Sequence, residues 1–153
     1  MIRLLLPIFL LISLYGAQQI EIKAKRFEAD EKKLVTKFFD HVKLTRGADV
    51  INADKAFVYF NKAKKPVKFD AIGNVTFKIT HEGKRYDGRC QELIYMPMKK
   101  EYILIGDVYV HQMPDDRKIY GQKIVLDLIS GNLLVEGEAK KPVKIIFKVE
   151  EKK

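Results

Sequence analysis

The chain has 153 residues, with 29 Lys and Arg against 20 Asp and Glu, and a formal net charge of +9. Hydrophobic residues make up 47% of it, with 9 Gly and 5 Pro, which excludes collagen-like, mucin-like and disordered chains. The length suits one domain with its own core, and the single cysteine, Cys90, excludes an intramolecular disulfide framework and a multi-thiolate zinc site. The excess of positive charge predicts an acidic partner.

The first element in chain order is an apolar N-terminal run. After a cationic start, residues 4–14 are almost wholly apolar, and Ala17 is followed by two glutamines. A cationic start, an apolar run of about 7–15 residues and a small exit residue are typical of a secretory signal. The run is also shorter than the ~20 apolar residues that span a bilayer. We therefore predict a cleavable signal peptide over residues 1–17 and a mature domain over residues 18–153. An uncleaved N-terminal anchor is the alternative.

From residue 20 onward the sequence alternates apolar and polar residues with a period of two, and helical periodicity is almost absent. The clearest strand is predicted over residues 67–79, where odd positions are apolar or Gly and even positions are polar except Ile72. Residues 38–44, 102–110 and 133–139 repeat this register more briefly. Such alternation gives each strand one buried and one wet face, which predicts an all-β fold.

The strands recur at an even spacing. Asp40-His41-Val42, Gly73-Asn74-Val75 and Gly106-Asp107-Val108 follow one another at intervals of 33 residues, and Gly137-Glu138-Ala139 comes 31 residues later. Fixed periods of this size are typical of stacked repeats, in which each unit buries its face against its neighbours. A glycine inside a strand marks a bulge or a bend. We therefore predict about four ~33-residue repeats of two strands each, stacked like a solenoid and bent at one place in each layer.

Residues 51–59, which read Ile-Asn-Ala-Asp-Lys-Ala-Phe-Val-Tyr, and then Ala71-Ile72-Gly73-Asn74-Val75 resemble the OstA-like repeat of periplasmic lipopolysaccharide-transport proteins. The resemblance implies a periplasmic, twisted β-jellyroll of stacked antiparallel strands, open along one side. It also implies an apolar interior that holds the acyl chains of lipid A. The implied partners are LptC-like inner-membrane and LptD-like outer-membrane proteins, with head-to-tail self-association through the terminal strands. The first repeat departs from the pattern, since Ala24-Lys25-Arg26 and Asp40-His41-Val42 replace the characteristic letters.

Alternation and this resemblance together assign the inward face of the stack as a lipid-binding groove. The predicted groove residues are Phe38, Val42, Leu44, Phe69, Val75, Phe77, Leu104, Val108, Val110 and Val135. Because each buried methylene contributes about 0.8 kcal/mol, burial alone is sufficient to hold a lipid with several acyl chains. Cations at the rim would orient its phosphates, and the candidates are Lys43, Arg46, Lys64, Lys65, Lys68, Lys99, Lys100, Lys140 and Lys141. Taken singly, each of these residues has a plain alternative as a core or solvent-facing side chain.

The ends of the stack are predicted to be strands with open edges. Residues 18–24 alternate cleanly and contain no Pro or Gly, and residues 143–149 follow Pro142 but contain no Pro themselves. Unpaired edge groups recruit another strand unless they are blocked, so β-augmentation would join the troughs of successive copies into one channel.

Other functional classes find little support in the residues. The three histidines lack metal-ligand spacing, no G-x-S-x-G elbow occurs, and Cys90 has no catalytic signature around it. We therefore predict no enzymatic activity, no metal and no cofactor. Export and the inward placement of the aromatic residues argue against nucleic-acid binding. The interpretation is a lipopolysaccharide carrier that bridges the two membranes. A membrane-anchored LptC-like component and a ligand-free structural β-solenoid are its alternatives.

Overall fold

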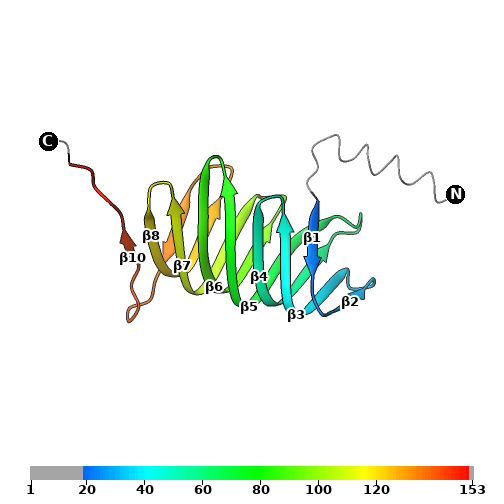
Figure 1. The fold of residues 1–153 in the computed structure, drawn as a ribbon. Helices are drawn as coiled ribbons and strands as arrows, with labels where there is room; N and C mark the ends of the chain where they lie inside the picture. The colour runs from blue at the N-terminus through cyan, green and yellow to red at the C-terminus, as the bar shows by residue number, and fades with distance from the viewer. Residues whose placement is uncertain (1–18, 152–153) are drawn as a thin grey trace.

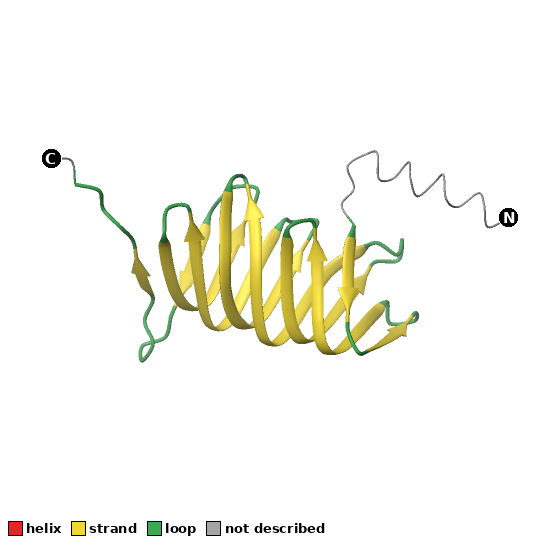
Figure 2. Ribbon diagram, in the orientation of Figure 1, coloured by secondary structure: helices red, strands yellow, loops and turns green. Residues whose placement is uncertain are grey.

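The computed structural model describes residues 19–151, which form ten strands joined by turns and loops and contain no helix (Figures 1 and 2). The strands are β1 (Ile20–Lys23), β2 (Arg26–Asp30), β3 (Val35–Arg46), β4 (Asp49–Phe60), β5 (Pro66–His81), β6 (Lys84–Met96), β7 (Glu101–Met113), β8 (Arg117–Asp127), β9 (Leu133–Glu136) and β10 (Lys144–Ile146). The all-β prediction is confirmed. No helix within this range is long and apolar enough to cross a membrane, and the predicted signal peptide lies outside the described residues.

All strands belong to one antiparallel sheet in the order β1-β3-β4-β5-β6-β7-β8-β10. The six long strands β3 to β8 follow one another as hairpins. β1 and β2 pair with the two halves of β3, and β9 and β10 pair with the two halves of β8. A broken strand therefore forms each end of the stack, as Figure 1 shows.

Each long strand bends near its middle, at the place that the recurring Gly-Asn and Gly-Asp pairs predict. At three bends, two residues of one strand oppose a single residue of the next, which is the arrangement of a β-bulge. The residues with positive φ at these bends are Asp40 (67°) and His41 (52°), Gly73 (87°) and Asn74 (47°), and Gly106 (86°) and Asp107 (44°). Gly, Asn and Asp tolerate this backbone region better than other residues, so local chemistry sets where the sheet folds over.

The predicted fourth copy of this bend is wrong. β9 ends at Glu136, and residues 137–143 leave the sheet in a turn closed by hydrogen bonds between the backbones of Glu138 and Lys141, before Lys144 rejoins β8. Gly137 packs against the returning backbone here, since an added Cβ would lie 2.7 Å from the Val143 nitrogen. The end strands are also shorter than the predicted ranges 18–24 and 143–149: β1 ends at Lys23, before the bend, and β10 ends at Ile146, opposite Lys118 near the start of β8.

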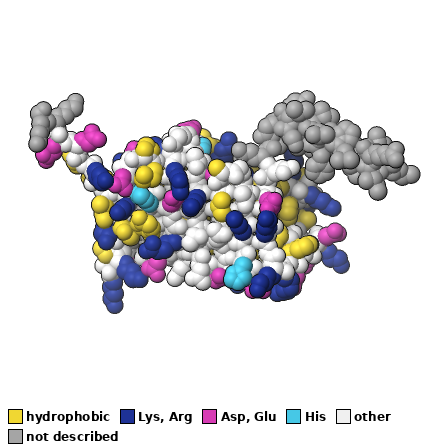
Figure 3. Space-filling view, viewed as in Figure 1, with side chains coloured by type: hydrophobic (Ala, Val, Ile, Leu, Met, Phe, Trp, Pro, Cys, Tyr) yellow, Lys and Arg dark blue, Asp and Glu magenta, His cyan; other side chains and the backbone are white. Residues whose placement is uncertain are grey.

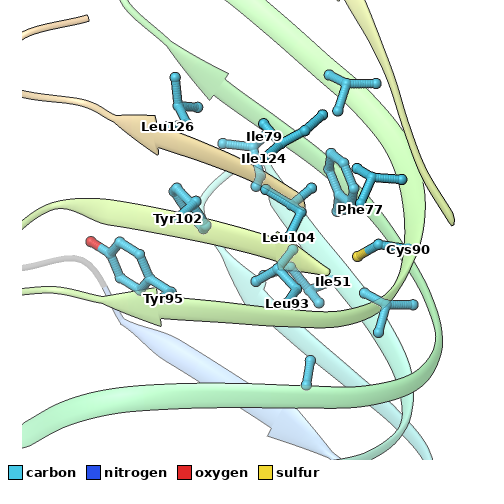
Figure 4. Close-up of a cluster of buried hydrophobic side chains, with 14 of the residues drawn as sticks. Ile51, Phe77, Ile79, Cys90, Leu93, Tyr95, Tyr102, Leu104, Ile124 and Leu126 are labelled. Atoms are coloured by element: carbon cyan, nitrogen blue, oxygen red, sulfur yellow. The ribbon is translucent and has the colours of Figure 1, made fainter. Parts of the chain in front are cut away.

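The bends fold the sheet into two walls that face each other across a common core. The first wall consists of the strand halves that contain Phe38, Val58, Phe69, Tyr95, Tyr102 and Leu126. The second wall consists of the halves that contain Leu44, Ile51, Phe77, Tyr86, Val110 and Ile119. Side chains from both walls form one buried cluster (Figure 4). The largest fully buried side chains in it are Leu93, Ile119, Ile124, Val75 and Val108.

Candidate functional site

The candidate site is the trough between the two walls, whose inner surface is lined by rows of cross-strand neighbours. On the first wall, one unbroken apolar row crosses eight strands, formed by Phe27, Phe38, Ala56, Ala71, Leu93, Leu104, Ile124 and Val135. The facing row on the second wall consists of Ile22, Leu44, Ile51, Phe77, Gly88, Val110, Ile119 and Ile145. Both rows reach the end strands, so the apolar surface runs the whole length of the stack.

The structure brings the ten predicted groove residues to this inner surface. Phe69, Val75, Phe77, Leu104, Val108 and Val110 belong to the buried cluster, Phe38, Leu44 and Val135 pack against it, and Val42 is 3% exposed. Their neighbours Lys78 and Asp107 are exposed on the opposite face, as the pleat requires. A ligand groove and an ordinary protein core would both bury these residues.

The predicted groove leaves out the inner residues of the strands that lie between the glycine-bearing ones. Ile51 on β4, Leu93 on β6, and Ile119 and Ile124 on β8 are as deeply buried as the predicted residues. Each half of these strands alternates with a period of two, which was the available signal, but the phase changes at the bend: in β8 the inward residues are Ile119 and Gly121 before it and Ile124 and Leu126 after it. The recurring glycine pattern marks the inner residues of β3, β5, β7 and β9 only.

The middle of the trough is filled by its own side chains. One cavity between the walls, beside Val42, Leu44 and Ala53, has a volume of about 20 Å³, and a second beside Ile20 and Phe69 is equally small. A cavity of this size holds about one water molecule. An acyl chain therefore needs the walls to move apart before it can lie between them.

Arg46 closes the mouth of the trough, where the hairpin turns form the free edges of the walls. It ends β3 on the second wall, and its Nη1 donates to the Tyr95 hydroxyl at 3.0 Å while Nη2 donates to the Tyr102 hydroxyl at 3.3 Å. Both tyrosines belong to the first wall, and their rings stack with centroids 4.5 Å apart. Nη2 also donates to Asp49 Oδ2 at 3.2 Å, and Asp49 Oδ1 accepts from the Thr80 amide at 2.9 Å.

The electrostatics of this cluster keep the arginine charged. Burial disfavours the charge of the guanidinium, but hydrogen bonds to Tyr95 and Asp49 and the nearby phenols outweigh it, so the pKa of Arg46 lies above its usual range. Burial likewise raises the pKa of Tyr102. The side chain of Arg46 is 23% exposed and that of Asp49 is 12% exposed, so this ion pair is screened less than a surface pair.

Of the other eight predicted rim cations, four lie at the free edge of the first wall and four lie elsewhere. Lys64, Lys65, Lys99 and Lys100 are exposed in hairpin turns at the free edge of the first wall. Lys43 and Lys68 alternate with inward residues and so lie on the outer faces of the walls. Lys140 and Lys141 lie in the turn after β9, where Lys141 Nζ is 3.0 Å from Asp107 Oδ1 at the outside of a bend. The prediction of a rim position is therefore wrong for Lys43, Lys68, Lys140 and Lys141.

Two ionisable groups are buried away from the mouth. Asp70 occupies an outward position on β5, yet it is 8% exposed and its Oδ1 has no hydrogen-bond partner. Burial, together with the neighbouring carboxyl of Glu92, raises the pKa of Asp70 to about 7. Burial also raises the pKa of the Cys90 thiol to about 12, so this thiol is inert in the core. No cluster of His, Cys, Asp and Glu that could hold a metal occurs in the described part of the chain.

Three comparisons place this geometry among known proteins. A family model described as LptA/(LptD N-terminal domain) LPS transport protein matches residues 21–132. The lipopolysaccharide export system protein LptA of Haemophilus influenzae is 29% identical over 134 residues, which cover 85% of this chain and 77% of that protein. The crystal structure of LptH, the LptA-homologous periplasmic component from Pseudomonas aeruginosa, covers 88% of this chain and 96% of its own, with a TM-score of 0.74 at 17% identity. This likeness confirms the predicted all-β fold of stacked antiparallel strands.

Proposed function

The chain belongs to the family of LptA and LptD N-terminal domain lipopolysaccharide transport proteins, and from this premise we propose that it carries lipopolysaccharide from the inner to the outer membrane. The observation that carries the proposal is the apolar inner surface, which is unbroken from β2 to β9 on the first wall. The acyl chains of lipid A lie between the walls, against the predicted groove residues. The protein binds and shields the lipid and catalyses no reaction, so the energy for directional transport comes from other components.

The location follows from the proposed signal peptide. Residues 1–17 direct export, and the mature domain of residues 18–153 works in the periplasm, where the relative from Pseudomonas aeruginosa is described as a component. Retention of the apolar run would instead make the chain a membrane-anchored LptC-like component. N-terminal sequencing of the exported protein separates these outcomes, because a start at or near Gln18 requires cleavage.

The two ends of the stack provide the surfaces for assembly. At one end Phe27 is 66% exposed on β2, and at the other Phe147 is 61% exposed just after β10 (Figure 3 shows hydrophobic side chains near both ends). Lys148 Nζ lies 2.7 Å from Asp116 Oδ2, which holds the C-terminal segment beside the turn between β7 and β8. Copies of the chain, and the LptC-like and LptD-like partners, join through these ends by strand addition, so that successive troughs become continuous.

A photo-crosslinking contrast tests the carrier function. We expect a photoreactive residue at Phe77, Leu104 or Val108 to capture lipopolysaccharide in the periplasm, because these side chains point between the walls. The same residue at Lys78 or Asp107 lies on the outer surface and is expected to capture none. The crosslinked adduct is measured as a band of reduced mobility on a denaturing gel that an antibody against lipopolysaccharide detects. Equal labelling at the inner and outer positions would remove the trough as the binding site and leave a ligand-free solenoid.

A further inference from the structure

The contacts of Arg46 join parts of the chain that lie far apart in sequence. Tyr95 and Tyr102 are 49 and 56 residues away, on strands β6 and β7, and the hydrogen bonds span the mouth from one wall to the other. The guanidinium also lies 5.1 Å from the centre of the Tyr95 ring. Any separation of the walls at this point breaks these contacts.

The space directly under the arginine is apolar. Ile20, Leu44, Ile51 and Phe69 line the small cavity there, together with the members of the hydrogen-bonded cluster. A hydrocarbon chain that enters from the mouth reaches this lining only where Arg46 and the tyrosines now meet. Insertion and the closed cluster therefore exclude each other.

The ion pair behaves differently from the contacts with the tyrosines. Asp49 begins β4 on the second wall, the same wall as Arg46, and its other oxygen is fixed by the Thr80 amide of β5. When the walls part, Arg46 keeps Asp49 and loses Tyr95 and Tyr102. The open mouth then presents a charged guanidinium, held at the edge of an apolar trough, with N–H donors that have lost their acceptors.

Those donors match one kind of ligand. A phosphate next to hydrocarbon chains offers oxygens for charge-assisted, bidentate hydrogen bonds to a guanidinium, while the chains replace the apolar contacts below. An uncharged headgroup offers weaker acceptors. The amphiphile that compensates best for opening the mouth is therefore one that combines acyl chains with an anionic headgroup.

We propose that Arg46 is both the latch of the trough and its selectivity residue: it joins the walls through Tyr95 and Tyr102 in the empty protein, and it binds the phosphate of an acylated lipid when the walls open. The inference rests on the proposed carrier function and adds a residue and a ligand preference to it.

Equilibrium binding to the mature protein tests the proposal, with lipid A and enzymatically dephosphorylated lipid A as the two probes. We expect the unmodified protein to bind the phosphorylated lipid about tenfold more tightly. Arg46→Gln is expected to reduce this preference to about unity, and Arg46→Lys to retain part of it because it keeps the charge but loses the bidentate fork. Lys43→Gln is the matched control, since it removes a cation three residues earlier on the outer face of the same strand and should leave the preference unchanged.

The double variant Tyr95→Phe with Tyr102→Phe tests the latch separately. It removes both hydroxyl acceptors and leaves Arg46 in place, so we expect both lipids to bind several-fold faster in stopped-flow measurements, with the preference for phosphate retained. An unchanged preference in Arg46→Gln, or an unchanged rate in the double variant, would overturn the proposal while leaving the carrier function intact. Failure of the unmodified protein to bind either lipid would overturn the carrier function as well.

Discussion

Gly88→Ala is expected to lower the free energy of unfolding by about 3 kcal/mol or more, although it adds a single methyl group. Gly88 lies in the inner row of the second wall, between Phe77 on β5 and Val110 on β7. A Cβ at this position would lie 2.0 Å from the carbonyl oxygen of Tyr109 and 2.7 Å from Cζ of Phe77. Because the nearer atom belongs to the backbone of the adjacent strand, relief requires the ladder itself to shift.

Urea denaturation followed by far-UV circular dichroism measures this loss. Gly83→Ala is the matched control, because Gly83 lies in the turn between β5 and β6 with φ of +78° and no atom within 4 Å of the added Cβ. It carries backbone strain without a steric conflict, so a cost of about 1 kcal/mol is expected. Similar losses in the two variants would show that the inner row is loosely packed at Gly88.

Ile146→Pro is expected to convert end-to-end assemblies of the mature protein into monomers at every concentration tested. Ile146 ends β10, which pairs only three residues with β8 and has no strand on its other side in the described chain. Proline removes a backbone donor and fixes φ, so strand addition at this edge fails. A contact between the β10 end of one copy and the β1 end of the next leaves a free end on each copy and does not form a closed ring. The unmodified protein should therefore form assemblies that lengthen with concentration.

Light scattering coupled to size-exclusion chromatography gives the masses for this comparison. Ile146→Ala keeps the backbone donor and removes only side-chain contact, so it should still assemble, more weakly than the unmodified chain. Lipid binding should survive in both variants, because Ile146 lies outside the inner row of the trough. An unmodified protein that stays monomeric throughout would rule out the bridge and leave a carrier that shuttles between the membranes.

The faces of the strands follow from the amino-acid sequence because they depend on neighbouring residues only. Phe77 points inward and Lys78 outward wherever the strand lies, since the pleat sends successive side chains to opposite sides. The bends at Gly73 and Gly106 are equally local, because they arise from residues that accept a positive φ. The sequence alone was therefore sufficient for the all-β class, the inner face of the glycine-bearing strands and the position where the sheet folds over.

Long-range packing decided the rest. Gly137 continues the spacing of the earlier glycines, but the chain returns on itself at Val143, and a turn replaces the fourth bend. Asp70 occupies an outward position in the alternation and is nevertheless buried beside Glu92. No local pattern predicts such effects, because they depend on where other strands place their side chains.

The mouth of the trough is the clearest case of this division. The sequence identifies Arg46 as one of nine candidate cations, and it separates Arg46 from Lys43 on the same strand only by the face on which each lies. Alternation turns Arg46 inward and Lys43 outward, and the facing of the two walls then brings Tyr95 and Tyr102 within hydrogen-bonding distance of it. A contact over 49 and 56 residues depends on the fold of the whole sheet, and for this reason the closed state of the trough emerges only in three dimensions.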